Sequence, residues 1–369
     1  MKNLQGNIVF FSAGAYLALD PESKKSSGGA ELQVALLAKE LTKLGCHVTI
    51  ASAGIPPEPQ WRQGVKLVGC GSFDSPRLPD IAAALPSVVQ MLINEKPAWV
   101  VVYGWTAWLG VLVALGFLFG FRTAYVCALD GELDSTYPCA SALRKKFFLW
   151  GVKHTNARFG ITNSHVERFK KIGKDAKLTR LLLVPEFAGL DQKKIPPQKS
   201  VDLLWVARCH PVKKPERFLE LVSALPETRC RMVCSPQDMQ LFERVVSAAK
   251  QIKNLEFLDG VPYREIQAHF DVAKVFVNTS TDEGVPNTFL HAAAGGTAIA
   301  SLGVDPDGCL REFGAGFSAN WNFYTLLEGV KNLLNNQSAL LKAAEGSKKL
   351  LTEWHDNSRN VKAFLDGLH

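Results

Sequence analysis

The sequence predicts an α/β protein built from two tandem Rossmann-like domains. Apolar strand segments alternate with helical patterns from end to end, which is typical of parallel sheets covered by helices on both faces. The chain has 369 residues, about twice the usual length of one domain. A polar stretch rich in Lys and Pro, residues 191–200, interrupts the alternation and is expected to be an interdomain linker.

The first predicted domain covers residues 1–190. Its strands are short runs rich in β-branched and aromatic residues, bounded by Gly, Pro and polar positions. We expect these strands at 7–12, 47–53, 65–69, 98–103, 122–128, 158–162 and 181–184. The helix with the clearest apolar periodicity covers 29–45 and starts directly after two glycines.

The segment 98–121 contains no charged residue and is long enough for a membrane span, which needs about 20 residues. Gly104 interrupts it, however, and Thr106 can cap a helix that ends near Phe119. The runs on either side have strand composition. We therefore predict a buried unit of strand, helix and strand, with a peripheral membrane contact through its helix left open.

The second predicted domain, residues 201–352, repeats the alternation. We expect strands at 202–207, 231–234, 255–258, 275–278 and 297–300. The remaining segment, 353–369, contains a helical pattern at 357–368 that can cross back onto the first domain. Because open α/β sheets bind ligands beyond the carboxyl ends of their strands, a cleft between the facing domains can hold one part of a substrate on each side.

The composition favours a cytoplasmic protein without a metal site. The eight cysteines show no paired CxxC or Cys–His spacing, so buried free thiols are expected rather than disulfides or a zinc site. The apolar run at 8–11 is too short for a signal peptide.

Positive charge is concentrated in residues 140–199, which hold 14 Lys and Arg against 4 Asp and Glu. The part of this stretch at 140–180, here called the basic region, contains the run 144–153 (RKKFFLWGVK), in which cations flank consecutive aromatic residues. Such a helix can lie on an anionic membrane surface, or its aromatics can be core and its lysines solvated. No recognition module for nucleic acid is visible, so nucleic acid is not an expected partner.

Two motifs suit an anionic ligand. Gly28 and Gly29 open a helix whose backbone NH groups favour an anion, although a plain turn uses the same glycines and the GxGxxG dinucleotide pattern is not present. Arg208 directly follows a strand, and Lys213 and Lys214 precede the next helix. These charges suit a departing nucleoside diphosphate, unless the lysines are merely solvated.

A third motif, residues 278–297, leads from a strand through a polar loop into a helix that begins at Pro286 or Asn287. Glu283 lies just ahead of this helix, where a carboxylate can bind sugar hydroxyls, and Gly284 lets the backbone approach a ligand closely. His291 faces the same site only if the helix is turned suitably, and a lone helical His is more often structural.

The order and spacing of the three motifs resemble those of retaining glycosyltransferases of the GT-B fold, family GT4 (glycosyltransferase group 1), over nearly the full length. The matching pieces are 28–34 (GGAELQV), 204–215 (LWVARCHPVKKP) and 278–290 (NTSTDEGVPNTFL), followed by Gly295 and Gly296. Each piece alone is a weak signal.

The resemblance implies metal-independent transfer of a sugar, with retention, from a nucleotide sugar to an acceptor hydroxyl. It implies no cofactor, and a UDP- or GDP-sugar is the favoured donor. The implied catalytic residues are Arg208, Lys213 and Glu283, and the implied donor-binding residues are Gly28, Gly29, Gly284, Val285, Pro286 and Asn287. Asp130 is added as a catalytic candidate and His291 as a donor-binding candidate, at positions that depart from the family pattern. Many relatives glycosylate lipid-linked acceptors at the cytoplasmic face of the membrane. For this chain we expect glycan or lipid-linked acceptors built during envelope, capsule or exopolysaccharide assembly, and a cytoplasmic location that can include the inner face of the plasma membrane.

Two positions depart from the family pattern. His291 replaces the second carboxylate, which typically binds the nucleotide ribose, although an imidazole can also bind hydroxyls. The run 128–132 (ALDGE) lies where many members carry a His near the sugar. Asp130 there either binds acceptor or sugar, or belongs to an ordinary Asp-Gly turn.

Three other hypotheses remain from the sequence. A degenerate GT-B protein would bind nucleotide sugars, or act as a scaffold, without catalysing transfer. A nicotinamide-dependent oxidoreductase explains the alternation but leaves 278–297 without a role. An integral membrane protein would use 98–121 as its span.

Overall fold

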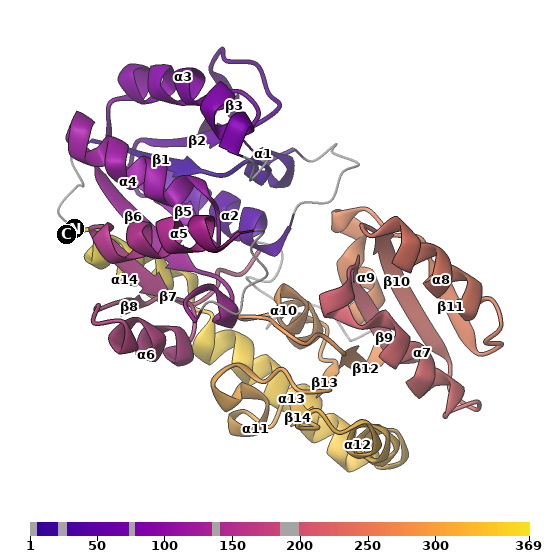
Figure 1. The fold of residues 1–369 in the computed structure, drawn as a ribbon. Coiled ribbons are helices and arrows are strands. Elements are labelled where there is room, and N and C mark those ends of the chain that lie inside the picture. The colour runs from indigo at the N-terminus through magenta and orange to yellow at the C-terminus, as the bar shows by residue number, and fades with distance from the viewer. Residues whose placement is uncertain (1–5, 21–27, 74–77, 135–140, 185–198) are drawn as a thin grey trace. The chain divides into compact units, whose positions relative to one another are not determined.

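The computed structural model describes residues 6–20, 28–73, 78–134, 141–184 and 199–369 (Figure 1). It divides into two compact units, one made of Met1–Leu182 with Asn357–His369 and the other of Leu183–Asp356. Each unit is a mainly parallel sheet covered by helices. This arrangement confirms the predicted α/β class with two Rossmann-like units. The predicted linker, 191–200, falls mostly outside the described residues.

The first unit contains an eight-stranded sheet in the order β3-β4-β2-β1-β5-β6-β7-β8, in which only β3 is antiparallel to its neighbour. Its strands are β1 Asn7–Phe11, β2 Val48–Ser52, β3 Gln60–Arg62, β4 Val65–Gly69, β5 Pro97–Tyr103, β6 Arg122–Cys127, β7 Ala157–Gly160 and β8 Lys177–Leu178. Its helices are α1 Ala15–Ala18, α2 Gly29–Lys43, α3 Leu78–Glu95, α4 Trp108–Phe119, the 3-10 helix η1 Asp130–Glu132, α5 Ala142–His154, α6 Asn163–Lys171 and α14 Asn357–Leu368.

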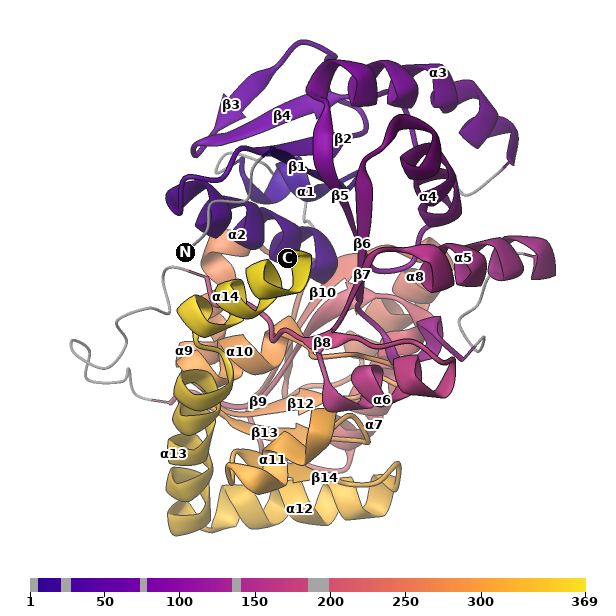
Figure 2. The same ribbon diagram turned by 90° about the vertical axis from the view of Figure 1, so that its left-hand side faces the viewer.

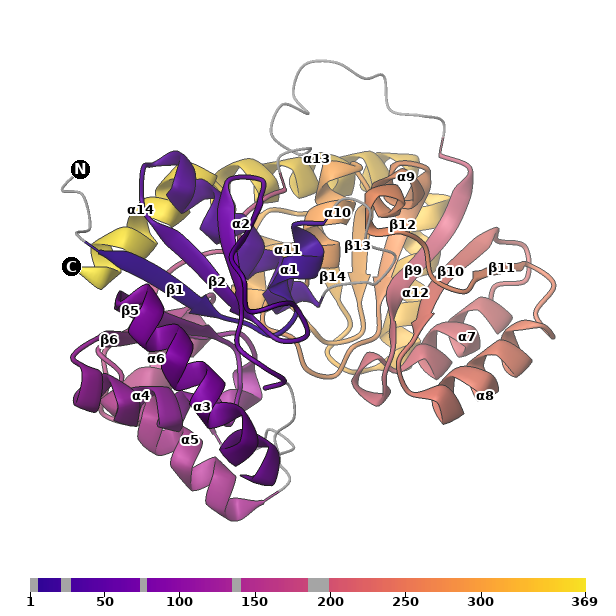
Figure 3. The same ribbon diagram turned by 90° about the horizontal axis from the view of Figure 1, so that it is seen from above.

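Alternate residues of β1 face two different layers of helices. Phe11 packs with the buried side chains of α3, α4 and α5 on one face. Phe10 faces the other way and lies against Phe364 of α14, with ring centroids 6.2 Å apart. Figure 3 shows the same division, with α2 and α14 on one side of the sheet and α3, α4 and α5 on the other. Burial on both faces explains why the strands are almost continuously apolar.

The segment 98–121 folds as the sequence predicts. β5 leads into α4, a helix of 12 residues, and β6 follows directly. The Thr106 hydroxyl accepts a hydrogen bond from the Trp108 amide at 3.3 Å, and Gly120 ends the helix in the left-handed conformation. Among the described residues, no helix is both long enough and apolar enough to cross a membrane.

The strand predicted at 181–184 is wrong. The last strand of the sheet is β8, and the buried residues that follow it have no strand partner. Side chains satisfy their backbone groups instead: Gln33 of α2 accepts from the Leu182 amide at 2.7 Å and donates to the Leu182 carbonyl at 3.0 Å. The apolar run at 181–184 therefore predicts burial correctly, but it does not predict whether the backbone pairs with a neighbouring strand.

The C-terminal helix α14 belongs to the first unit, where it packs on β7, β8 and α2 (Figure 2). Phe364 is fully buried and lies 4.7 Å from Phe159 of β7 between ring centroids. Thr179 donates a hydrogen bond to the Asn360 carbonyl at 3.3 Å. The last residues of the chain thus complete the core of the unit in which the chain begins.

The second unit contains a six-stranded parallel sheet in the order β11-β10-β9-β12-β13-β14. Its strands are β9 Val201–Cys209, β10 Cys230–Pro236, β11 Leu255–Leu258, β12 Ala273–Asn278, β13 Ala298–Ser301 and β14 Gly316–Ser318. Its helices are η3 Pro211–Lys213, α7 Pro215–Ser223, α8 Met239–Ala249, η4 Tyr263–Glu265, α9 Ile266–Asp271, α10 Asn287–Ala294, η5 Pro306–Gly308, α11 Cys309–Glu312, α12 Phe323–Asn335 and α13 Gln337–Trp354.

The neighbours β9 and β12 position the candidate site. They pair in parallel, with Leu203 opposite Val275 and Leu204 opposite Phe276. One side of the sheet packs against α7, α8 and α12, the other packs against α9, α10 and α11, and α13 contributes residues to the cores on both sides. Because both strands run in the same direction, the loops after them emerge side by side at one edge of the sheet.

Candidate active site

The loop after β9 forms a cationic corner. Arg208 is exposed at the end of the strand, and Lys213 ends the short helix η3. Lys214 follows with φ 47°, a left-handed conformation that turns the chain into α7. Partial burial, together with the Arg208 and Lys213 cations, holds the pKa of His210 below its usual value. The His210 ring is therefore neutral at pH 7, and the charge of this corner comes from the Arg and Lys side chains.

Hydrogen bonds fasten the loop after β12 to the loop after β9. Thr279 donates its hydroxyl to the Lys213 carbonyl at 2.7 Å and accepts from the buried indole of Trp205 at 2.9 Å. Thr281 donates its amide to the Val212 carbonyl at 2.8 Å, and its hydroxyl reaches the same oxygen at 3.2 Å. These bonds run from the core to the surface, so they fix the two loops relative to each other.

The two candidate charges of these loops meet. Lys213 Nζ forms an ion pair with Glu283 Oε1, although the residues are 70 positions apart. The Ser280 hydroxyl donates to the same oxygen at 3.0 Å. The second oxygen of Glu283, Oε2, has no hydrogen bond within the described part of the chain. The carboxylate is thus oriented through one oxygen, and the other remains for a ligand.

The turn that follows Glu283 places a helix end beside this pair. Gly284, Val285 and Pro286 are buried, and α10 begins at Asn287 with Pro286 as its N-cap residue. The start of α10 agrees with the sequence prediction. A helix N-terminus carries partial positive charge from its unpaired NH groups, which suits a polar or anionic ligand next to the ion pair.

His291 lies inside the second unit. Its side chain is 5% exposed and stacks on Phe270 of α9, with ring centroids 5.4 Å apart. Nδ1 lies 2.9 Å from the Gln267 side-chain oxygen, and Nε2 lies 3.3 Å from the Tyr263 hydroxyl. Burial lowers the pKa of His291 to about 4, so the ring is neutral at pH 7. Tyr263, which is 43% exposed, carries this network to the surface.

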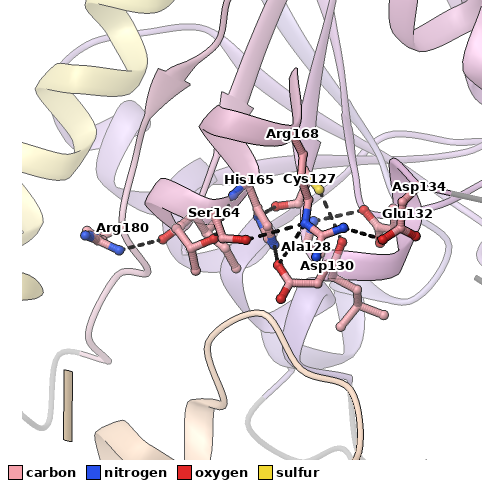
Figure 4. A network of polar contacts seen from close by, with 12 residues as sticks. Cys127, Ala128, Asp130, Glu132, Asp134, Ser164, His165, Arg168 and Arg180 are labelled. Carbon is pink, nitrogen blue, oxygen red and sulfur yellow. Dashed lines mark hydrogen bonds and ion pairs between the residues drawn. The ribbon is translucent and has the colours of Figure 1, made fainter. Parts of the chain in front are cut away.

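Asp130 belongs to a polar network at the carboxyl end of β6 (Figure 4). It lies in η1, and its Oδ1 atom is 3.1 Å from His165 Nε2 and 3.8 Å from Arg168 Nε. Burial alone raises its pKa, but His165, Arg168 and Ser164 together hold the pKa below its usual range. Asp130 is therefore an ionised carboxylate, and its side chain is 41% exposed.

A second, buried carboxylate, Glu132, holds the backbone of this network in place. Glu132 is 3% exposed and accepts hydrogen bonds from the Tyr125 hydroxyl at 2.6 Å, the Ala128 amide at 3.0 Å and the Trp105 amide at 3.1 Å. Burial raises its pKa in spite of these donors. Glu132 thus holds the chain between β6 and η1 in place, and this segment positions Asp130.

Gly28 and Gly29 lie at the start of α2 in the first unit. Gly28 is the N-cap residue, with φ −73° and ψ 169°, and the Leu32 amide donates to its carbonyl at 3.0 Å. A Cβ at Gly28 would overlap the Glu31 carboxylate, which lies over the helix end. Position 28 does not need glycine for a left-handed backbone, and a Cβ there would only displace the flexible Glu31 carboxylate that lies beside the helix end.

The structure thus joins some candidate residues and separates others. Within the second unit it brings Lys213 and Glu283 into contact beside the start of α10, whereas His291 points into the α9–α10 interface. Sequence reasoning missed Thr279, Ser280 and Thr281, which lie inside the quoted 278–290 motif, and it missed His165. Thr162 is a residue type that often caps a helix, so the sequence could have indicated that α6 begins here. It gives no signal that His165 contacts Asp130.

Two family models match the chain. The model described as Glycosyl transferase 4-like domain matches residues 28–181, and the model described as Glycosyl transferases group 1 matches residues 200–336. Together they cover most of both units. The chain therefore belongs to the glycosyltransferases. No curated protein is significantly similar to it in sequence.

Solved structures with a similar fold extend over nearly the whole chain. Sucrose-phosphate synthase from Thermosynechococcus elongatus is 13% identical, with 98% of each chain covered and a TM-score of 0.78. HepE from Anabaena, in complex with UDP and glucose, is 12% identical, with 98% of each covered and a TM-score of 0.73. WaaG, a glycosyltransferase involved in lipopolysaccharide biosynthesis, is 14% identical, with 97% of this chain and 98% of WaaG covered and a TM-score of 0.70. These similarities establish the GT-B fold.

The buried imidazole of His291 gives the second unit a pH-dependent stability. Its pKa rises from about 4 in the folded chain to its usual 6.5 on unfolding, so the unfolded chain takes up the proton first as pH falls. Stability from this group is complete above pH 6.5 and is lost toward pH 4. We expect a loss on the order of 2 kcal/mol between pH 7 and pH 5.

Urea unfolding of wild type and His291→Gln at both pH values measures this loss. The variant should lose less stability than wild type, because it has no imidazole at this position to charge. Equal losses in the two proteins would mean that His291 is not the titrating group.

Proposed function

We propose that the chain is a retaining glycosyltransferase that moves a sugar from a nucleotide-sugar donor to an acceptor hydroxyl. The observation that carries this proposal is the Lys213–Glu283 ion pair, which joins the two loops at the carboxyl edge of the second sheet. A diphosphate and a sugar are adjacent groups in a nucleotide sugar, so adjacent positive and negative ligands fit that substrate.

In this proposal, Arg208 and Lys213 bind the donor diphosphate. The bond to the sugar breaks as negative charge grows on the leaving diphosphate, and fixed cations stabilise that charge most effectively when they are held in advance. Lys213 is held by Glu283 and by the backbone bonds to its loop. The N-terminus of α10 adds partial positive charge, so transfer is proposed to proceed without a metal ion.

Glu283 is proposed to bind donor sugar hydroxyls through Oε2, with the loop Gly284, Val285, Pro286 and Asn287 lying along the sugar. The buried glycine at 284 allows close approach of the backbone. Gly28 and Gly29 of the first unit are proposed to approach the same donor. Retention follows from front-face attack by the acceptor, and we assign no protein nucleophile. His291 is a proposed contributor to ribose binding, acting through Tyr263 because its own ring is buried.

Asp130 is proposed to accept a hydrogen bond from the acceptor or from the donor sugar. It is ionised, partly exposed and located where a strand of the first unit ends. An ionised carboxylate cannot donate a proton at neutral pH, so its proposed role is to orient a hydroxyl or to accept its proton. The acceptors we propose are glycans or lipid-linked glycans of envelope, capsule or exopolysaccharide assembly, as with the lipopolysaccharide role of WaaG.

Calorimetric titration with UDP, GDP, ADP and their sugar conjugates tests the donor site. Without divalent metal, wild type should bind one nucleotide selectively and its sugar conjugate more tightly, with a UDP- or GDP-sugar favoured. Lys213→Ala should lose affinity for nucleotide and conjugate alike, on the order of tenfold or more, because the diphosphate loses a cation. Glu283→Gln should lose mainly the extra affinity of the sugar.

Lys214→Ala is the matched control for this titration. Its exposed side chain forms no ion pair in the described part of the chain, so this variant should bind like wild type. Addition of divalent metal should leave the affinities unchanged. Equal losses in Lys213→Ala and Lys214→Ala would refute the assigned diphosphate contact.

The burial of His291 favours one competing function, a nucleotide-sugar-binding protein that does not catalyse transfer. Its imidazole contacts Gln267 and Tyr263 rather than the surface, so the position does not offer a ligand directly. A donor hydrolysis assay separates the two functions. Slow release of free sugar from the bound donor supports the transferase, and binding without any release supports the degenerate protein.

We further propose that helix α5 of the basic region lies on an anionic membrane surface. Leu143 and Phe147, one helical turn apart, are 66% and 40% exposed, whereas Phe148 is fully buried in the core. Lys146 and Lys153 are also exposed. Cations beside exposed apolar side chains are the combination that binds anionic lipid surfaces. The expectation that the aromatic residues of this helix lie in the core is thus confirmed for Phe148 but not for Phe147.

Cosedimentation with phospholipid vesicles tests this surface. Wild type should bind vesicles containing anionic lipid, and should not bind purely zwitterionic vesicles. Lys146→Ala with Lys153→Ala should weaken binding about 30-fold, since each cation near the surface contributes about 1 kcal/mol. Lys342→Ala with Lys349→Ala on α13 is the control for charge alone, and an equal loss in that pair would contradict the assignment to α5.

A further inference from the structure

His165 is the buried centre of the network at the end of β6. It lies in the first turn of α6, where its amide donates to the Thr162 hydroxyl at 3.1 Å, and its side chain is fully buried. A Cβ at Gly160 would come within 2.7 Å of the His165 Cβ, so the glycine makes room for the histidine. The local backbone thus places the His165 imidazole inside the unit, next to Asp130.

Both ring nitrogens of His165 face oxygen atoms. Nδ1 lies 3.1 Å from the Cys127 carbonyl oxygen, and Nε2 lies 3.1 Å from Asp130 Oδ1 (Figure 4). A carbonyl oxygen only accepts hydrogen bonds, and so does an ionised carboxylate. A neutral imidazole has one N–H, so either tautomer would leave a nitrogen lone pair against an oxygen. The doubly protonated ring donates to the Cys127 oxygen and places its positive charge beside Oδ1, where the Nε2–Oδ1 contact is an ion pair rather than an aligned hydrogen bond.

The surrounding charges favour a cation at this position. Asp130 and Glu132 of η1 both face the ring, and Arg168 of α6 lies 3.8 Å from the same oxygen of Asp130 that His165 contacts. Arg168 also pairs with Asp134, so its charge is shared between two carboxylates. The Cys127 thiol, on β6, is buried and uncharged, because burial raises its pKa. A positive ring therefore balances carboxylates that Arg168 alone does not neutralise.

We propose that His165 is an imidazolium that fixes the Asp130 carboxylate in place, and that it acts as a positioning residue for the proposed sugar transfer. The positioning role rests on the proposed function, whereas the charge of His165 does not depend on it. The ion pair uses Oδ1 of Asp130, and the carboxylate, whose side chain is 41% exposed, is proposed to meet a hydroxyl of acceptor or sugar. With its proton held on His165, Asp130 stays an acceptor and never becomes the acid of the reaction.

NMR of the full chain with 15N-labelled histidine rings measures the charge of His165 without any substrate. At pH 7 both of its ring nitrogens should show the shifts of protonated nitrogen, with the signals assigned by their loss in His165→Gln. In Asp130→Asn the ring should become neutral, with one unprotonated nitrogen. A neutral His165 ring in wild type at pH 7 would overturn the inference.

Kinetics with the donor identified by calorimetry then separate positioning from a purely structural role. His165→Gln should lower kcat on the order of tenfold, and it should change the donor Kd no more than Asp130→Asn does. The double variant with Asp130→Asn should be no slower than Asp130→Asn alone, because His165 acts through that carboxylate. A further loss in the double variant, or a loss of donor affinity in His165→Gln larger than that in Asp130→Asn, would contradict a positioning role.

The two proposals fail separately in these experiments. If His165→Gln does not fold, Asp130→Asn still reports the ring charge, because its side chain lies partly at the surface. Failure of wild type to bind any nucleotide sugar refutes the proposed function, and the NMR result still decides the charge of His165.

Discussion

The parallel pairing of β9 and β12 is the constraint on which the candidate site depends. Neighbouring parallel strands deliver their following loops to one edge of a sheet, whatever their separation along the chain. Here the pairing places Lys213 beside Glu283 across 70 residues, and the two threonines at 279 and 281 bond the loops together. The pairing of the two strands therefore determines where the site lies, and the charged side chains determine what it can bind.

Both units use the same arrangement at the end of a strand. In the second unit a lysine holds one oxygen of Glu283, and in the first unit His165 and Arg168 hold one oxygen of Asp130. Each carboxylate is oriented before a substrate arrives, and the side chain of Asp130 is also partly exposed. Such preorganisation reduces the entropy lost when a hydroxyl-bearing ligand binds, which is why paired carboxylates suit the recognition of sugars.

The sequence predicts local patterns well and side-chain directions poorly. Apolar alternation located most strands, and α14 agrees with the pattern at 357–368 because that helix is regular and amphipathic. The short edge strands β3 and β14 were missed, since three residues give too little periodicity. The quoted motifs located Lys213 and Glu283, but the burial of His291 and the contact of His165 with Asp130 depend on how helices pack, which no local pattern records.

A double-mutant cycle on donor binding tests the central claim, that Lys213 and Glu283 form one site. Calorimetry would give the Kd of the selected nucleotide sugar for wild type, Lys213→Met, Glu283→Gln and the double variant. Paired side chains should be coupled by about 1 kcal/mol or more, so the double variant should lose less affinity than the sum of the single losses. Losses that add within about 0.5 kcal/mol would mean that the two residues act independently. Unchanged affinity in all three variants would place the donor site elsewhere.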